Sequence, residues 1–250
     1  MDSKATYSEF SNPRLVEIYN TVNPVSGYKD FFLKMASVLS AESIIDLGCG
    51  SGLLSCELSE AGHRVIGIEP SAHMLDLARK SSCADQVMWV NGGVGELKSL
   101  RADLVIMSGH VAQFFLDDSE WDEALRAIRD SLSTGGHLIF DSRNPEAELF
   151  ESWPKKTSPQ RLLDARAGEI EWWYELAGTS EGRVRYEIHY RFIATDDELV
   201  SLCELRFRTQ GEISQSLANA GFSISSTFGD WDSSAVDVTS PEMIFVAVAV

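Results

Sequence analysis

The sequence predicts an α/β fold in which a mostly parallel sheet of seven strands is flanked by helices. Short apolar segments alternate with amphipathic ones from residue 43 to residue 141, as is typical of parallel strands joined by helical crossovers. Two further apolar segments, 222–228 and 243–248, return to the same sheet near the end of the sequence. The 250 residues suffice for one large domain, so we expect residues 1–250 to form a single unit.

Each expected element has its own signal in the sequence. Nearly continuous apolar runs predict strands at 43–47, 64–69, 86–90, 102–107, 137–141, 222–228 and 243–248. Apolar residues at helical spacing predict helices at 12–20, 28–39, 53–61, 71–80, 119–132 and 212–220. Asn12 and Ser71 stand where helix N-caps are favoured, and Gly62 stands where a helix ends.

The periodicity changes to two in residues 168–208. On the first segment the apolar face consists of Ile170, Trp172, Tyr174 and Leu176, and Trp173 lies among the glutamates of the other face. Two similar segments follow after turn residues, so we expect a small three-stranded antiparallel insertion with one buried face. This insertion and the N-terminal helices of residues 1–40 are expected to cover the sheet edge at which open α/β folds bind ligands.

Charge and cysteine content limit the classes of partner. The formal net charge of -17 repels phosphate backbones and anionic membranes, so neither nucleic acid nor a membrane is expected as a partner. No apolar run approaches the ~20 residues that span a bilayer. Cys49, Cys56, Cys83 and Cys203 form no C-x-x-C pair. This spacing argues against a metal site and a disulfide framework, and indicates a cytoplasmic location. The oligomeric state is not visible in the sequence.

Three alternating glycines follow the first strand of the sheet. Gly48, Gly50 and Gly52 allow a sharp turn and a close approach to a ligand, and the next helix offers free N–H groups at its start. The spacing is G-x-G-x-G. Dinucleotide-binding loops have G-x-G-x-x-G, and here Leu53 takes the place of the last glycine.

Two carboxylates flank this loop along the chain. Glu69 ends the second strand, where it either accepts two hydrogen bonds from a ribose diol or serves as a charge at the start of the next helix. Asp46 precedes the glycines. A carboxylate there repels a pyrophosphate but attracts the ammonium group of a methionyl moiety, which favours the second kind of ligand.

The stretch IIDLGCGSGLLSCELSEAGHRVIGIEPSAHMLDLAR, with this loop and both carboxylates, is similar to the signature of class I methyltransferases that use S-adenosylmethionine (SAM). The resemblance covers nearly the whole chain. It is strongest for a small-molecule-type group with an antiparallel insertion after the fifth strand. It implies a Rossmann-like sheet, SAM as cofactor, and methyl transfer to a small-molecule acceptor mainly by alignment of the nucleophile.

The resemblance also implies roles at matching positions. Contacts to the methionyl and ribose parts of SAM are implied for Tyr19, Asp46, Gly48, Cys49, Gly50, Glu69 and Ser108, and contacts near the adenine for Pro70 and Met74. Tyr19 can equally be a core aromatic residue of its amphipathic helix.

One position departs from the family pattern. Many members have an acidic residue after the third strand that accepts from the adenine amino group, and Gly93 stands there, leaving the backbone of Val94 as the contact. This departure keeps a non-catalytic SAM-binding or scaffold protein open as an alternative. A nicotinamide-dependent oxidoreductase is a further alternative, which Asp46 and Leu53 disfavour.

Polar residues after the fourth and fifth strands are candidates for the acceptor site. An imidazole at His110 with an ordinary pKa of about 6.5 is a candidate general base, and a hydrogen-bonded loop histidine is the other interpretation. Asp141 and Arg143 are expected either to hold the substrate or to pair with each other.

Overall fold

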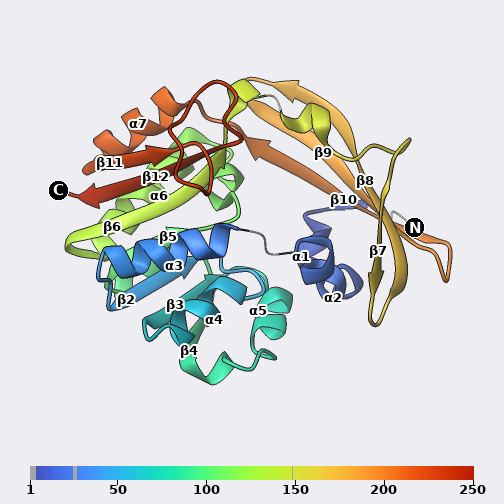
Figure 1. Cartoon of the computed structure of the whole chain (residues 1–250), viewed down its shortest axis with the longest axis horizontal. Coiled ribbons are helices and arrows are strands. Elements are labelled where there is room, and N and C mark those ends of the chain that lie inside the picture. Colours follow the sequence, from blue (N-terminus) through green and yellow to red (C-terminus); the bar gives the residue numbers. More distant parts are fainter. Residues whose placement is uncertain (1–3, 25–26, 148) are drawn as a thin grey trace.

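The computed structural model of the protein describes residues 4–24, 27–147 and 149–250. Two sheets organise the chain (Figure 1). The larger sheet has seven strands in the order β11-β12-β6-β5-β2-β3-β4. Their bounds are β2 Ser43–Leu47, β3 Arg64–Glu69, β4 Val87–Asn91, β5 Ala102–Met107, β6 Leu132–Arg143, β11 Phe222–Phe228 and β12 Glu242–Ala249. Strands β2 to β6 pair in parallel, whereas β12 is antiparallel to both of its neighbours. The predicted mostly parallel seven-stranded sheet is confirmed.

Helices cover both faces of this sheet, because side chains alternate between the faces along each strand. Ile44 faces one way, into a cluster with residues of α3 (Tyr28–Val38) and α4 (Leu53–Glu60). Ile45 faces the other way, toward α6 (Asp118–Ser131) and α7 (Gln210–Asn219). The expected helices are present, including α5 (Ala72–Ala78), whose N-cap Ser71 accepts from the backbone N–H of Met74.

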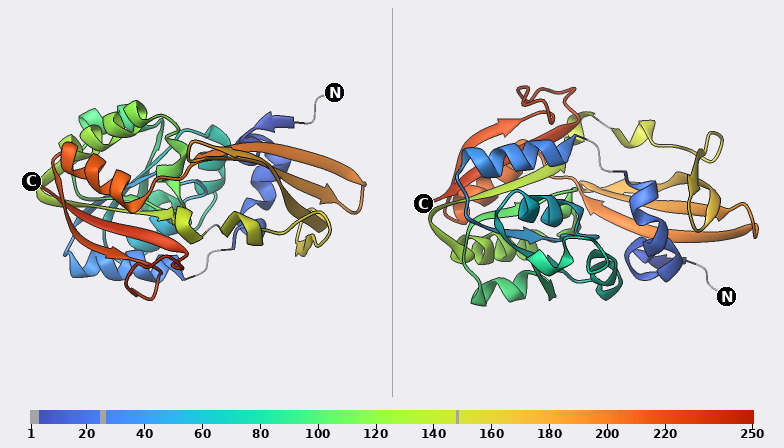
Figure 2. Two further views of the ribbon diagram at one scale, coloured as in Figure 1. Left: turned by 90° about the horizontal axis from the view of Figure 1, so that it is seen from above. Right: turned by 60° about the horizontal axis from the view of Figure 1, so that its bottom comes forward.

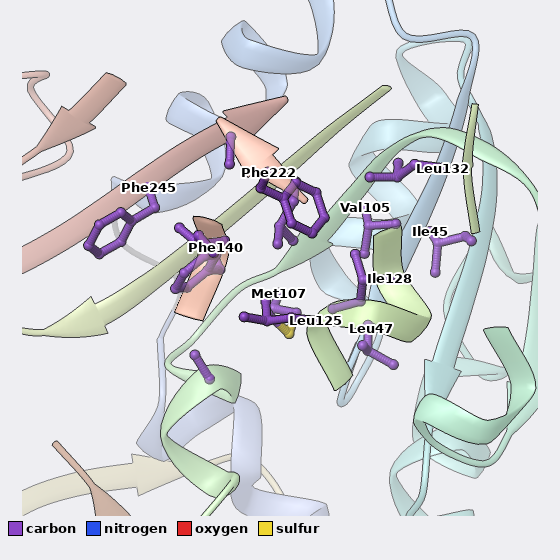
Figure 3. Close-up of a cluster of buried hydrophobic side chains, with 14 of the residues drawn as sticks. Ile45, Leu47, Val105, Met107, Leu125, Ile128, Leu132, Phe140, Phe222 and Phe245 are labelled. Carbon is purple, nitrogen blue, oxygen red and sulfur yellow. The ribbon is translucent and has the colours of Figure 1, made fainter. Parts of the chain in front are cut away.

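The cluster on the α6 face is the largest of the three buried hydrophobic clusters among the described residues (Figure 3). Phe140 of β6 and Phe245 of β12 stack with their ring centroids 5.2 Å apart. The indole of Trp121 on α6 meets Phe140 edge to face at 5.5 Å. These buried rings fix how β12 sits beside β6, and this register decides which polar residues meet at the ends of the two strands.

The second sheet is larger than the sequence indicates. The predicted meander of β8 (Gly168–Ser180), β9 (Arg183–Phe192) and β10 (Asp197–Arg206) is present, and all its pairings are antiparallel. Two short strands extend it to the order β1-β10-β9-β8-β7. β7 (Gln160–Asp164) adds an antiparallel edge, and β1 (Lys4–Thr6) pairs in parallel with β10. The segments KAT and QRLLD contain neither an apolar run nor an alternation that a sequence pattern can reveal.

The burial of β8 differs from the expected pattern at two residues. Leu176 pairs with the buried Tyr186, just before a register shift, but it is 49% exposed, so the expectation that it would be buried was wrong. Trp173, which lies on the other face, is only 4% exposed, because its ring stacks on the imidazole of His189 at 4.9 Å. An outer face rich in glutamates therefore still buries one indole.

The N-terminal helices pack against the second sheet (Figure 2). Helix α1 (Ser8–Ser11) is a single turn, and α2 (Pro13–Val22) begins after Asn12, whose side chain accepts from the Arg14 N–H. Leu15 and Ile18 of α2 are buried against apolar side chains of β8 and β9. The first helices thus belong spatially to the insertion, although about 150 residues of chain separate them from it.

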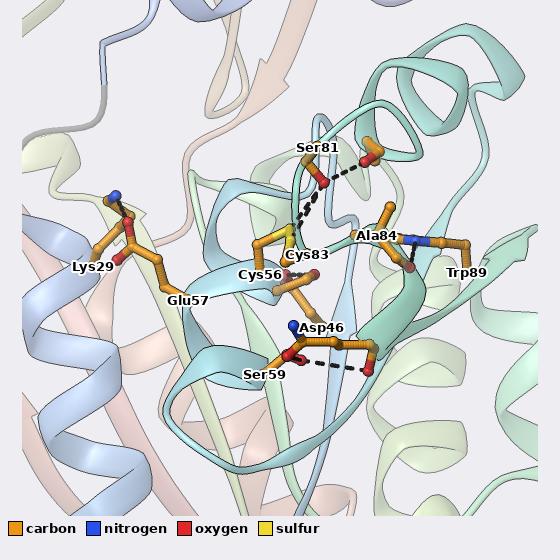
Figure 4. The surroundings of a disulfide bond; sticks show 12 residues. Lys29, Asp46, Cys56, Glu57, Ser59, Ser81, Cys83, Ala84 and Trp89 are labelled. Atoms are coloured by element: carbon orange, nitrogen blue, oxygen red, sulfur yellow. Dashed lines mark hydrogen bonds and ion pairs between the residues drawn. A yellow bond between two sulfur atoms is a disulfide. The ribbon is translucent and has the colours of Figure 1, made fainter.

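Cys56 and Cys83 form a disulfide between α4 and the segment before β4 (Figure 4). Their Cα atoms are 5.5 Å apart, which is within the range for such a bond. The sequence argued against a disulfide framework and did not predict this single bond, because the two cysteines are 27 residues apart and only the α/β fold brings them together. None of the described helices is long and apolar enough to cross a membrane.

Candidate active site

The glycine loop leaves β2 in a left-handed conformation. Gly48, Gly50 and Gly52 have φ of 77°, 55° and 76°, values that side-chain-bearing residues rarely adopt. The N–H groups of Gly48 and Cys49 both donate to the carbonyl of Ile68, at 2.7 and 3.1 Å, and this fixes the loop to β3. A Cβ on Gly50 would contact only the Met74 methyl, at 3.6 Å, so the loop leaves room at this position.

Asp46 has one carboxylate oxygen without a partner. The residue is fully buried, and its Oδ2 accepts from the Ser55 hydroxyl at 2.6 Å. Oδ1 has no hydrogen-bond partner among the described residues. Burial raises the pKa of this carboxyl to about 6, although the Ser55 bond lowers it. A donor or cation placed beside the glycine loop would satisfy this oxygen.

Glu69 connects the glycine loop to the start of α5. One of its carboxylate oxygens accepts from the Gly50 N–H at 3.0 Å and the other from the Ser71 N–H at 2.8 Å. Burial raises the pKa of the carboxyl, and the two backbone donors oppose that shift. Two roles were predicted for Glu69, a contact to a ribose and a charge at the start of a helix. The structure shows the second directly, because Glu69 accepts from the N–H of Ser71, the N-cap of α5. The carboxylate also lies at the strand edge where a ribose is expected.

The residues implied for adenine binding lie at the ends of β3 and β4. Pro70 is exposed, whereas Met74 is fully buried beneath the loop. The Asn91 side chain donates to the carbonyls of Glu69 and Pro70, at 3.0 Å each, and so fixes the two strand ends relative to each other. Nothing lies within 4 Å of the position of a Cβ on Gly93, and Val94 begins the short helix η2 (Val94–Ser99).

The N-terminal helices reach the loop through side chains that the sequence did not single out. The Ser51 hydroxyl donates to Oδ1 of Asn20 on α2 at 2.6 Å, and the Ser71 hydroxyl donates to the Phe10 carbonyl. Tyr19 packs on Phe10 with ring centroids 5.8 Å apart. Burial raises the pKa of Tyr19, so its hydroxyl stays protonated near the site.

His110 lies in a turn between β5 and the short helix η3 (Val111–Phe114), just after Ser108. Its backbone is left-handed, with φ of 66°. Asp141 at the end of β6 accepts from the N–H of Gly109 at 3.0 Å and from that of His110 at 2.8 Å. The turn also contacts the glycine loop, since a Cβ on Gly48 would come within 2.6 Å of a methyl group of Val111.

Glu242 completes this group, although no role was predicted for it from the sequence. The His110 Nε2 atom is 3.0 Å from both carboxylate oxygens of Glu242 and 3.5 Å from Asp141 Oδ2. Glu242 stands at the start of β12, whose antiparallel pairing places it opposite Arg143 of β6. Only this tertiary pairing connects position 242 with position 110.

Burial dominates the electrostatics of the group. It lowers the pKa of His110 to about 3, together with the nearby Arg143 charge, so the ring is neutral at physiological pH. The expectation of an ordinary histidine pKa was therefore wrong. Burial raises the pKa of Asp141 to about 6 and that of Glu242 to about 7. Low-dielectric surroundings disfavour the charged form of each group.

Arg143 connects this group to the second sheet. Its guanidinium donates to Gln113 Oε1 at 3.0 Å and lies 5.6 Å from the ring of Trp153. The Trp153 ring in turn lies 4.8 Å from both Tyr174 and Tyr186. Asp141 is occupied by two backbone donors instead. The aromatic inner face of the insertion therefore meets the ends of β6 and β12 at Arg143.

The ligand atoms of His110, Asp141 and Glu242 lie within 4.8 Å of one another, and by atom type they match a divalent-cation site. Two observations oppose this use. The Arg143 charge acts on all three groups. Both Asp141 oxygens already accept backbone hydrogen bonds.

Comparison with known proteins agrees with this geometry. Residues 44–136, which contain the glycine loop, Glu69 and His110, match the family described as "Methyltransferase domain". These residues are therefore similar to a methyltransferase domain. The sequence is 26% identical over 224 residues to a putative methyltransferase of Geobacillus sp. strain WCH70, covering 86% of this chain and 87% of that protein.

Two other proteins are similar to different shares of the chain. The cypemycin N-terminal methyltransferase of Streptomyces sp. is 32% identical over 108 residues, 43% of this chain and 44% of that enzyme. A SAM-dependent methyltransferase from Clostridium acetobutylicum has the same fold, with a TM-score of 0.79 at 16% identity, covering 94% of this chain and 98% of that chain. The fold is thus shared nearly throughout, whereas the sequence likeness to the Streptomyces enzyme spans under half of each chain.

Proposed function

We propose that this protein transfers the methyl group of SAM to a small-molecule acceptor. The observation that carries the proposal is the unpartnered oxygen of Asp46, buried beside the left-handed glycines at the end of β2. A buried carboxylate without a partner is costly, and the ammonium group of the methionyl moiety would remove that cost.

The other implied residues fit the rest of the cofactor. Glu69 lies one strand away and still has lone pairs for the ribose hydroxyls, while Cys49 and Gly50 border the same edge. Pro70, Met74, Gly93 and Val94 would surround the adenine, with the Val94 backbone making the polar contact. Tyr19 and Ser108 would border the methionyl end, on opposite sides of the loop.

The acceptor would lie between the end of β6 and the inner face of the second sheet. Asp141 and Arg143 mark one side, and Trp153 with Tyr174 the other. This wall is mostly aromatic, and the net charge of -17 opposes a nucleic-acid substrate. Both features support a small organic acceptor, with the N-terminal helices and residues 168–208 closing over it.

Alignment would supply most of the rate. The methyl group leaves a positively charged sulfur, so the protein has to hold the acceptor atom in line and exclude water. His110 is the candidate base: its ring is neutral at physiological pH and belongs to the turn that contacts the glycine loop. A weak base suffices when the acceptor becomes strongly acidic as it gains the methyl group.

Calorimetry with SAM and with S-adenosylhomocysteine tests the proposal. One site per chain is expected, and Gly50→Val should abolish binding, because a branched side chain at φ of 55° strains the loop and fills the ligand space. Gly50→Ala is the milder control. No heat from either ligand with folded wild-type protein would refute the proposal. Incubation with labelled SAM and a metabolite extract would then identify the product, whereas tight binding without turnover would favour a binding protein.

A further inference from the structure

The His110 ring is held from one side only. Within the described ranges, the polar contacts of the ring are all made by Nε2, to the two Glu242 oxygens and to Asp141 Oδ2. The side chain of Glu242 is 12% exposed and that of His110 is 18% exposed, so water competes weakly for these contacts. A neutral imidazole carries one proton. Above about pH 7, where Glu242 is ionised, the nitrogen that faces this carboxylate is the one that keeps the proton.

The backbone beneath the ring is held separately. Asp141 accepts from the N–H groups of Gly109 and His110, and the His110 carbonyl accepts from Gln113 at 2.9 Å. Asp141 is thus used mainly to hold the left-handed turn, and Glu242 is left to orient the imidazole. The two carboxylates come from neighbouring antiparallel strands, in which Ile244 pairs with Asp141 and Glu242 pairs with Arg143.

We propose that Glu242 is a positioning residue that keeps the proton of His110 on Nε2 and so leaves Nδ1 as the atom that accepts the proton of the substrate. This inference rests on the proposed function. In the step, a lone pair of the acceptor forms the new bond to the methyl carbon, and the bond from carbon to sulfur breaks with its electron pair on sulfur. The acceptor proton moves to Nδ1, giving an imidazolium whose charge faces Glu242, and it is later released to water.

Several charged groups act on this pair. Asp141 and Arg143 of β6 act on the ring, and Arg143 together with Asp230 acts on Glu242. Tyr28 of α3 is near Asp141. Among these groups Glu242 alone lies 3.0 Å from the ring nitrogen. Substitutions at position 242 can therefore test separately whether its charge or its acceptor oxygens orient the ring. Glu242→Gln keeps an acceptor oxygen without the charge, and Glu242→Ala removes both.

Nitrogen NMR of ring-labelled histidine tests the inference in full-length protein with S-adenosylhomocysteine added. His110→Gln identifies the His110 signals by their loss, and His63, His73 and His137 serve as internal references. We expect the wild type and Glu242→Gln to carry the proton on Nε2, and Glu242→Ala to populate both tautomers. Asp230→Asn is the matched control and should leave the tautomer unchanged. Labelled-product formation should fall roughly 10-fold or more in Glu242→Ala, with unchanged affinity for S-adenosylhomocysteine.

Three results would overturn the inference. These are a proton on Nδ1 in the wild type, an unchanged tautomer in Glu242→Ala, or His110 signals that shift when Mg²⁺ or Zn²⁺ alone is added, which would assign the group to a metal. The NMR readout needs no turnover. A failure of S-adenosylhomocysteine to bind would therefore count against the proposed function and leave the tautomer measurement valid.

Discussion

Two carboxylates at the glycine loop differ in what the protein already gives them. Both Glu69 oxygens accept backbone hydrogen bonds, whereas one Asp46 oxygen has no partner among the described residues. Glu69 therefore holds the glycine loop and the start of α5 in place in the free protein. Asp46 keeps one oxygen that can accept a hydrogen bond from the ligand. The two residues should respond differently to substitution and to pH.

Glu69→Ala should weaken SAM binding by about 1.5–3 kcal/mol, roughly 10- to 150-fold in Kd, which is the range for hydrogen bonds to a charged group. The Gly50 and Ser71 N–H groups lose their acceptor in the same variant. Glu69→Gln keeps one acceptor oxygen and should lose less. An unchanged Kd by calorimetry would mean that the ribose is held elsewhere and that Glu69 serves only the start of α5.

The affinity for SAM should fall below about pH 6. The pKa of Asp46 is raised to about 6 in the free protein, so the carboxyl is ionised above that pH and protonated below it. An ammonium group binds the ionised form, so affinity should approach a tenfold loss per pH unit on the acid side and level off above about pH 7. Asp46→Asn should bind weakly with little pH dependence. A wild-type Kd that stays constant between about pH 5 and 8 would contradict this assignment.

The raised pKa of Asp46 makes the stability of the ligand-free protein change with pH in the opposite direction to the affinity for SAM. A carboxyl that binds its proton more tightly when folded stabilises the fold fully below its unfolded pKa of about 4, and this contribution is lost as pH rises through about 6.

At the level of elements, the sequence predicted what periodicity can encode. The strands of the larger sheet, the three long strands of the insertion and the helices around them were expected within a few residues of their bounds. β1 and β7 were missed because the segments KAT and QRLLD contain neither a continuous apolar run nor an alternation, and only pairing with a distant strand makes them strands. Leu176 was expected to be buried, but it lies near the end of the contacts between β8 and the hydrophobic cluster and is 49% exposed.

The site shows the same limit. Asp46 and Glu69 were predicted because they flank one loop along the chain, and His110, Asp141 and Arg143 because they follow the fourth and fifth strands. Glu242 was not found, because the pairing of β12 with β6 alone places it at His110. The lowered pKa of His110 was not predicted either, because it results from burial in the folded chain.

The N-terminal helices should act together with the insertion as a cover. The bond from Ser51 to Asn20 already connects α2 to the glycine loop, and the bond from Ser71 to Phe10 connects α1 to the start of α5. Helix α2 also packs on β8 and β9. Hydrogen exchange should therefore slow in residues 4–24 and 168–208 when SAM and the acceptor found by product labelling are both present. Protection limited to the glycine loop would defeat this prediction. Asn20→Ala should reduce the effect in α2.

At the scale of the whole molecule, the bond between Cys56 and Cys83 closes a loop that contains β3, Glu69 and α5. Cross-linking residues 27 apart restricts the unfolded chain and should stabilise the fold by about 3–4 kcal/mol. Reducing agent, or the double substitution of Cys56 and Cys83 by serine, should lower Tm by roughly 10 °C. The oxidised, denatured protein should show two reactive thiols, those of Cys49 and Cys203, and four after reduction. Four thiols without reduction, together with a Tm indifferent to reductant, would mean that the two sulfurs are neighbours without a bond. The hydrophobic clusters around β2 and β3 would then hold this half of the cofactor site alone.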